Sequence, residues 1–329
     1  MPPLNVGIPI TVTNGLTYAF AILSSISSFG AICLFALLYK TNGHFIAREK
    51  LVLTLIIAGF INAVNTSLST LAVVLQMPIS DELCAANGWI AQFSVQINDF
   101  THFAMAIVTF YILTHCKSSY AMEVVESYIH YILAVIWFVP IITASVGGAV
   151  NGFGWSGTWC WFKGTPVEVA NIVRYTLTHG PRIFIFITLI CVYCGLWFIL
   201  RKKHCANLKE LKELKKINGN CTSESHFKYS NHNSPNIDNT KLDEEVTHAI
   251  NKMLLYPVFY IILWSGGMAN RVVEATGNTS DLTTFLQAFT RLVTFADSAL
   301  FAYNYAWKRV IKANSKSTLY FSSRKALNI

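Results

Sequence analysis

The amino-acid sequence predicts an all-α membrane protein: a seven-transmembrane-helix bundle with the N-terminus outside and the C-terminus in the cytoplasm. Of its 329 residues, 53% are hydrophobic and 13% are charged, whereas an ordinary soluble domain carries about 25% charged residues. No Lys, Arg, Asp, Glu or His precedes Lys40. Seven mostly apolar runs follow one another along the chain, and each is long enough to cross a bilayer as a helix of about 20 residues. These observations exclude an ordinary soluble fold.

The expected spans are Leu16–Tyr39, Leu51–Leu75, Gly88–Leu113, Ile129–Val150, Asn171–Leu200, Lys252–Asn270 and Leu282–Trp307. Residues 1–15 are expected to form a short extracellular N-terminus. They lack a basic segment and a cleavage site, so the first apolar run is expected to act as a signal anchor. The seven-span domain is then 16–307, followed by a cytoplasmic tail at 308–329.

The distribution of basic residues orients the predicted bundle. The first, third and fifth connections and the tail carry 20 of the 25 Lys and Arg residues, and the opposite side carries five. Because Lys and Arg concentrate on the cytoplasmic side of membrane proteins, the side with 20 is expected to be cytoplasmic. This alternation fits only an odd number of spans with the N-terminus outside. The fifth connection, at about 201–251, is the one long loop, and it is expected to be cytoplasmic.

Two of the eight cysteines are expected outside the membrane. Cys84 precedes the third span and Cys160 lies between the fourth and the fifth. Since disulfides persist in oxidising compartments, a bridge is expected to tie the top of the third helix to the second outer loop. The alternative is a pair of free thiols. No spacing of Cys or His residues resembles a metal site, so no metal is expected.

Ionisable residues inside the spans are candidates for function because burying charge in a membrane is costly. Asp99 and His102 are three residues apart and share one face of the third helix. Asp297 lies at a comparable depth in the seventh helix. One interpretation is a polar network, an intramembrane switch whose members change partners on activation. The other is a static buried cluster that fixes the packing of the helices.

A second group of charged residues lies toward the outer ends of the last three spans. Its cationic members could line an outer cavity and bind an anion such as a phosphate. These candidate ligand-binding residues are Arg174, His179, Arg182, Arg271 and Arg291. The alternative is pairing with Glu168, Glu274 and Asp281 at loops and helix ends. Asn278 begins an outward glycosylation sequon, although it lies close to the membrane.

Several motifs together resemble those of a known receptor family. Trp159-Cys160-Trp161-Phe162 is followed by Arg174-Tyr175 and His179-Gly180-Pro181. The start of the third span and the Tyr256-Pro257 region of the sixth fit as well. This combination is similar to the cyclic-AMP-receptor-like G-protein-coupled receptors of slime moulds and fungi, which include fungal receptors linked to glucose sensing. The resemblance covers about residues 16–307.

This resemblance implies a G-protein-coupled receptor of the plasma membrane, with a small extracellular ligand and a heterotrimeric G protein as partners. The signal would then reach the cyclic-AMP pathway. We expect no catalytic residues, no cofactor and no nucleic-acid partner. The seventh span has no Lys for a retinal Schiff base, which excludes a microbial rhodopsin. A seven-helix transporter or channel for a small solute is the alternative function.

Overall fold

The protein folds into long helices and one short hairpin. The computed structural model describes residues 10–42, 45–114, 118–155, 160–163, 167–219, 237–275 and 281–304. The long helices are α1 (Ile10–Asn42), α2 (Ala47–Val74), α3 (Asp81–Thr114), α4 (Ser118–Asn151), α6 (Gly180–Gly219) and α7 (Ile237–Ala275). The shorter elements are β1 (Phe153–Trp155), β2 (Cys160–Phe162), α5 (Val167–Arg174), the π-helical turn η1 (Tyr175–His179), α8 (Asp281–Ala288) and the 3-10 turn η2 (Phe289–Leu292). Residues 293–304 are again helical.

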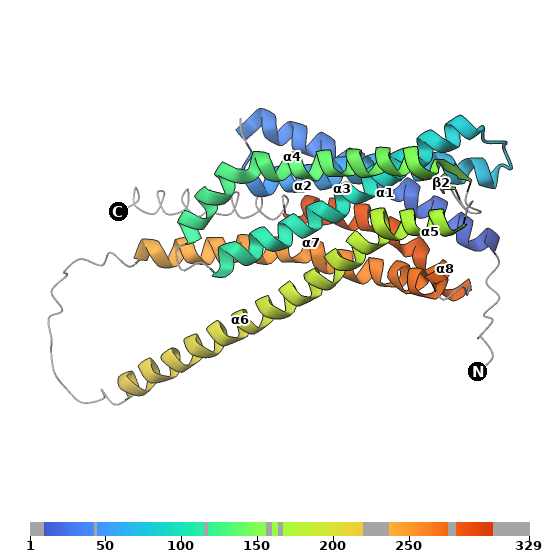
Figure 1. Ribbon diagram of the computed structural model, residues 1–329. Coiled ribbons are helices and arrows are strands. Elements are labelled where there is room, and N and C mark those ends of the chain that lie inside the picture. Colours follow the sequence, from blue (N-terminus) through green and yellow to red (C-terminus); the bar gives the residue numbers. More distant parts are fainter. Residues whose placement is uncertain are drawn as a thin grey trace, which may run out of the picture.

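The helices lie side by side as a bundle, and α3 is its central member (Figure 1). α3 packs against α2, α4, α6 and α7, and its first turns also contact both strands of the hairpin. The described part of α6 extends well beyond the bundle at the end away from the hairpin (Figure 1). We call the opposite end, where β1 and β2 lie, the hairpin end.

Each expected span falls on helix, to within a residue at its ends, wherever the structure describes it. Five helical segments of the described chain are long and apolar enough to cross a membrane: Val12–Lys40, Ala47–Val74, Asp81–Thr114, Tyr120–Asn151 and Asn171–Ile199. The expected sixth span lies in α7, which begins well before it. The expected seventh runs through α8, η2 and residues 293–304 and is therefore interrupted by a 3-10 turn. The protein is thus a multi-pass membrane protein built mainly of helices.

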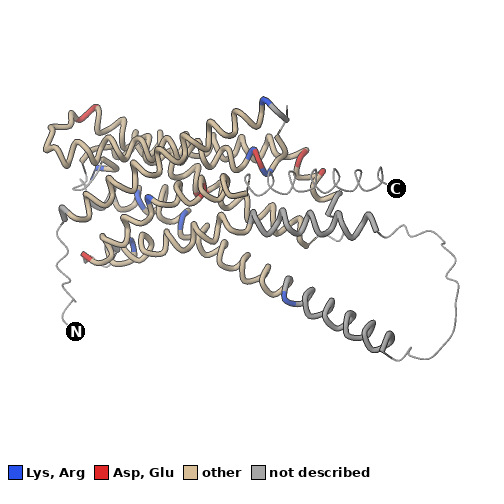
Figure 2. Tube along the Cα trace, turned by 180° about the vertical axis from the view of Figure 1, so that it is seen from behind, with Lys and Arg blue, Asp and Glu red and all other residues tan. Residues whose placement is uncertain are grey.

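The outer faces of the helices are apolar, as a lipid environment requires. On α4, the exposed side chains recur every three or four residues, at Tyr131, Val135, Phe138, Ile142 and Val146. This spacing places them on one face of the helix. Figure 2 shows that charged residues are sparse along the bundle. Tight packing occurs inside instead, where Leu51, Ile97, Met105 and other apolar side chains form the core.

Local chemistry explains where α2 and α3 begin. Glu126 of α4 accepts the backbone N–H of Ala47 and also pairs with Lys50 at 2.7 Å, so it satisfies the free start of α2. Ser80 accepts the backbone N–H of Leu83, and Asp81 follows in the first turn of α3. Carboxylates and hydroxyls at these positions stabilise a helix N-terminus by completing its unpaired N–H groups.

The hairpin lies against the start of α3. β1 and β2 are antiparallel, with Phe153 opposite Phe162 and Trp155 opposite Cys160. Cys84 of α3 and Cys160 of β2 form the expected disulfide. Phe162 is fully buried, and its ring stacks on Phe153 with the centroids 4.7 Å apart. The hairpin is therefore anchored covalently at one end and by aromatic packing along its length.

Candidate functional site

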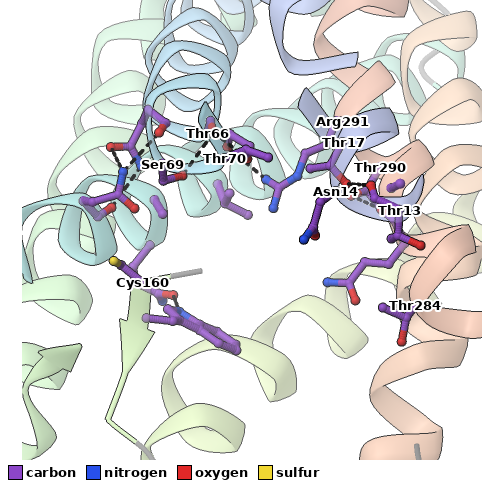
Figure 3. A pocket seen from close by; sticks show the side chains of 18 of the residues that line it. Thr13, Asn14, Thr17, Thr66, Ser69, Thr70, Cys160, Thr284, Thr290 and Arg291 are labelled. Carbon is purple, nitrogen blue, oxygen red and sulfur yellow. Dashed lines mark hydrogen bonds between the residues drawn. The ribbon is translucent and has the colours of Figure 1, made fainter. Parts of the chain in front are cut away.

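A cavity lined mostly by polar residues opens between the helices at the hairpin end. Its wall includes the ends of α1, α2 and α3, the strand β2, and residues of η1, α6, α7, α8 and η2. The cavity volume is about 110 Å³, several times the roughly 10–15 Å³ that one water molecule needs. Figure 3 shows the labelled side chains around this space, with Thr66, Ser69 and Thr70 across from Thr284. The cavity has room for a small molecule.

Hydroxyl and amide groups form the side of the cavity made by α1 and α2. Asn65 and Asn87 bind each other reciprocally: each side-chain amide nitrogen donates to the other's backbone carbonyl at 3.0 Å. The hydroxyls of Thr17 and Thr70 each donate to a carbonyl oxygen one turn earlier in their own helix. Because those O–H groups are used inside the helix, their oxygens are left to accept hydrogen bonds from the cavity.

A buried ion pair lies behind the opposite wall. The Nε of Arg182 in α6 donates to Oδ2 of Asp99 in α3 at 2.8 Å, and both side chains are more than nine-tenths buried. Tyr260 of α7 donates its hydroxyl to the other carboxylate oxygen, also at 2.8 Å. The guanidinium of Arg182 also lies 4.3 Å from the ring centroid of Trp264. Arg182 and Trp264 line the cavity, so the pair connects its wall to the interior of the bundle.

The π-helical turn η1 sets the direction of these side chains. Pro181 has no N–H, so the carbonyl of Leu177, four residues earlier, loses its helical donor. Gln96 of α3 supplies a replacement, donating its amide N–H to that carbonyl at 2.5 Å. The wider turn brings Thr178 and Arg182 to the cavity but not Arg174. A regular helix would place all three on one face; the extra residue per turn changes that register.

Gly180 is required for this turn. Its N–H donates to the carbonyl of Tyr175, and a methyl group on Gly180 would lie only 2.6 Å from that carbonyl oxygen. We expect Gly180→Ala to lower the free energy of unfolding by about 1–3 kcal/mol, the usual cost of overpacking. Thermal unfolding of the purified protein in lipid nanodiscs measures this loss. Gly30→Ala is the control, since a methyl there contacts nothing within 4 Å. Equal stability of the two variants would contradict the requirement.

A second polar cluster lies where β2 meets α3. The side-chain carbonyl oxygen of Gln92 accepts two hydrogen bonds, from Nε1 of Trp161 at 3.2 Å and from Oγ1 of Thr178 at 3.0 Å. Gln92 is 3% exposed, and its amide nitrogen has no acceptor among the described residues. Since the disulfide at Cys160 precedes Trp161 directly, it fixes this tryptophan in the cavity wall.

The structure separates the five candidate ligand-binding residues into two groups. Arg182, Arg271 and Arg291 line the cavity. In Figure 3, Arg291 reaches from η2 toward Thr66, whose hydroxyl it contacts at 3.3 Å. Arg174 and His179 lie behind Trp161 instead: Arg174 donates to the carbonyl of Phe162 at 2.8 Å, and the buried His179 packs edge-on against the indole.

The three candidate switch residues lie along one path through the interior. His102 and Asp297 are almost fully buried, with Nε2 and Oδ2 3.6 Å apart, too far for a hydrogen bond. The hydrogen-bond partners of Asp99 among the described residues are Arg182 and Tyr260 rather than His102 or Asp297. The ring of Tyr260 packs on that of His102 at 4.4 Å and so connects the two pairs. Among the described residues, no cluster of three His, Cys, Asp or Glu could hold a metal.

Comparison with known proteins identifies the family. The sequence profile described as "Git3: G protein-coupled glucose receptor regulating Gpa2" matches residues 13–206, more than half of the chain. The chain belongs to this family of G-protein-coupled receptors. The Ascaroside receptor GPR2 of Arthrobotrys oligospora is 26% identical over 193 residues, which are 57% of this chain and 45% of that protein. The chain therefore aligns with less than half of that relative's length.

The fold has a counterpart among solved structures. The crystal structure of squid rhodopsin superposes with a TM-score of 0.59, covering 90% of this chain and 82% of that one at 13% identity. At this identity, the likeness concerns the fold alone. The region matched by the Git3 family contains Gln92, Asp99 and Arg182, whereas Arg271 and Arg291 lie beyond it.

Sequence reasoning missed several residues of this candidate site. Gln92, Tyr260 and Trp264 were not among the candidates, nor were the hydroxyl groups of α1 and α2. One signal for Gln92 was available: Gln92, Gln96, Asp99 and His102 recur every three or four residues and so share a polar face of α3. Asn278, the sequon residue, lies outside the described part of the chain.

Proposed function

We propose that the chain is a seven-helix receptor of the plasma membrane that senses a small extracellular ligand. In this proposal the hairpin end faces outside, residues 1–15 form the extracellular N-terminus, and the loop at 201–251 and the tail at 308–329 are cytoplasmic. α7 supplies the sixth span, and residues 282–307 supply the seventh. The bias of Lys and Arg toward the loops at the other end supports this orientation.

The observation that carries the proposal is the cavity itself. It lies at the end that we propose faces outside, three arginines line it, and a disulfide-tethered hairpin forms one wall. Cavities between the helices of a bundle, with a few polar groups that orient the ligand, are common ligand sites. The family is described as glucose receptors and the similar curated protein as an ascaroside receptor. Both descriptions favour a small extracellular ligand, and we propose that it binds here.

The proposed mechanism is a shift between two packings of the bundle. Arg182 contacts both the cavity and Asp99, and Asp99 contacts Tyr260 of α7. A ligand that competes for Arg182 would weaken its hold on Asp99, and Tyr260 and the His102–Asp297 pair would then rearrange. Because a ligand shifts an equilibrium only through contacts that differ between the states, Arg182 is the residue through which binding reaches the interior. The proposed output is a heterotrimeric G protein acting on the cyclic-AMP pathway, without catalysis by the chain itself.

A panel of ligands tests this function in cells that express the chain, with G-protein dissociation as the readout. We expect an agonist response in wild type and a rightward shift of at least about tenfold in Trp161→Ala, equivalent to about 1.4 kcal/mol of lost binding. Trp155→Ala is the matched control, since Trp155 lies in the same hairpin but is exposed and outside the cavity. Equal shifts in the two variants would contradict the proposal that the ligand binds in this cavity.

A further inference from the structure

The Gln92 side chain has a fixed orientation that bears on what the cavity can bind. The indole N–H of Trp161 can only donate, so the atom of Gln92 that faces it must be the carbonyl oxygen. The hydroxyl of Thr178 donates to the same oxygen. These two bonds determine the amide orientation and leave the NH2 group, buried in the cavity wall, without an acceptor in the described chain. A buried donor with no acceptor is unfavourable and gains free energy when a ligand supplies one.

The charged groups beside Gln92 are also donors. Arg182 uses its Nε on Asp99, and that is its one hydrogen bond within the described structure, so its terminal N–H groups retain their capacity to donate. Arg271 and Arg291 line the same cavity. No Asp or Glu is among the described lining residues of the cavity. Asp99 lies behind Arg182 and is not in the wall. Guanidinium groups with an amide N–H form strong charge-assisted bonds with carboxylate or phosphate oxygens.

The α1–α2 side of the cavity offers the opposite chemistry. Thr17 of α1 and Ser69 and Thr70 of α2 each donate their O–H to a backbone carbonyl within their own helix. Their oxygens can then accept hydrogen bonds from a ligand. An ammonium group would also satisfy them, but it would lie close to three guanidinium groups in a cavity with no carboxylate among its described lining residues. Hydroxyl groups satisfy the same acceptors without that cost.

We propose that the cavity selects a small polyhydroxylated anion, a sugar-like molecule with a carboxylate or phosphate group. The anion would bind the Gln92 amide and the guanidinium groups of Arg182 and Arg271, and its hydroxyls would donate to the threonine and serine oxygens. The inference rests on the proposed function for the site and specifies the ligand's chemical class.

Binding to the purified chain in nanodiscs tests this class without a G protein. The probes are D-glucose, D-glucuronate and D-glucose 6-phosphate, each titrated while the thermal unfolding midpoint is followed, because a ligand stabilises the state that it binds. We expect at least one of the two anions to act at a concentration at least about tenfold below that of neutral glucose. If glucose acts as strongly as both anions, or if neither anion stabilises the folded protein, the proposal is overturned.

Gln92→Glu tests the role of the amide. One carboxylate oxygen can still accept from Trp161 and Thr178, while the other replaces the donor with a negative charge. We expect the affinity for the better anion to fall at least about 100-fold, from a lost charge-assisted bond and added repulsion. Met77→Glu adds the same charge at an exposed position outside the cavity and should leave affinity unchanged. Wild-type affinity in Gln92→Glu would overturn the proposal.

Failure of this inference and failure of the receptor function give different results. If glucose drives nucleotide exchange on a G protein while the anions neither bind nor activate, the ligand class is wrong and the receptor function stands. If an anion binds through Gln92 but no probe drives exchange, the ligand class stands and the receptor function fails.

Discussion

Asp99→Ala is expected to destabilise the protein by about 3–5 kcal/mol, because it leaves the charge of Arg182 buried without its partner. The carboxylate accepts from both Arg182 and Tyr260 at 2.8 Å, so one substitution removes the partner of two buried donors. The unfolding midpoint in nanodiscs and the amount of folded protein at the cell surface measure this loss. Much of the mutant is expected to remain unfolded or intracellular.

Removing both charges at once separates the cost of an unpaired charge from that of lost packing. The double variant Asp99→Asn with Arg182→Gln contains neither of the two charges, so no buried charge is left without a partner. We therefore expect it to recover much of the stability lost in Asp99→Ala. It should nevertheless respond poorly to ligand, because Arg182 no longer connects the cavity with Asp99. Lys50→Ala is the control, since its pair with Glu126 is partly exposed and such pairs contribute about 0–1 kcal/mol. A double variant no more stable than Asp99→Ala would contradict the argument from charge.

Replacing Cys84 and Cys160 with serine is the second change with a large expected effect. The bridge joins residues 76 positions apart, and removing a disulfide that closes such a segment typically costs about 2–5 kcal/mol. Trp161 follows Cys160 directly and bonds to Gln92, so its place in the cavity wall should also loosen. We therefore expect a lower unfolding midpoint together with weaker ligand binding.

The combined measurement of stability and binding tests the two roles of the bridge. Cys33→Ala is the control, because Cys33 is exposed and unpaired in α1. If the serine variant lost stability but bound ligand with wild-type affinity, the bridge would be structural alone, and the hairpin would not position Trp161 for binding.

The helices were predictable because their apolar runs and charged ends are long-range features of composition. The expected spans fall on helix through the described chain, and the disulfide follows from two cysteines placed on the same side. What could not be predicted is the register of the helices, that is, which side chains face one another inside the bundle. The partner of Asp99 depends on the π-helical turn before Pro181. The sequence shows this proline, but it does not show which group donates to the carbonyl of Leu177 in its place. The 3-10 turn η2, which positions Arg291, likewise leaves no mark in an apolar run.

The uncharged polar residues of the site could not be predicted for a related reason. Charged residues in a span stand out because burial is costly, and this selected Asp99, His102 and Asp297. Gln92 and the threonines of α1 and α2 carry no charge, and a threonine in a helix can satisfy its own hydroxyl. Their role depends on which helices face one another, as Asn65 and Asn87 illustrate by pairing between α2 and α3.

Nucleotide exchange by purified components tests the central claim most directly. The wild-type chain is placed in nanodiscs with a purified heterotrimeric G protein, and guanine-nucleotide exchange is followed with no ligand, with D-glucose and with D-glucose 6-phosphate. The account predicts that at least one ligand accelerates exchange and that the Asp99→Asn, Arg182→Gln double variant, although folded, does not respond. Ligand-independent solute uptake or ion conductance in proteoliposomes, with no effect of any ligand on exchange, would contradict it and favour a transporter or channel.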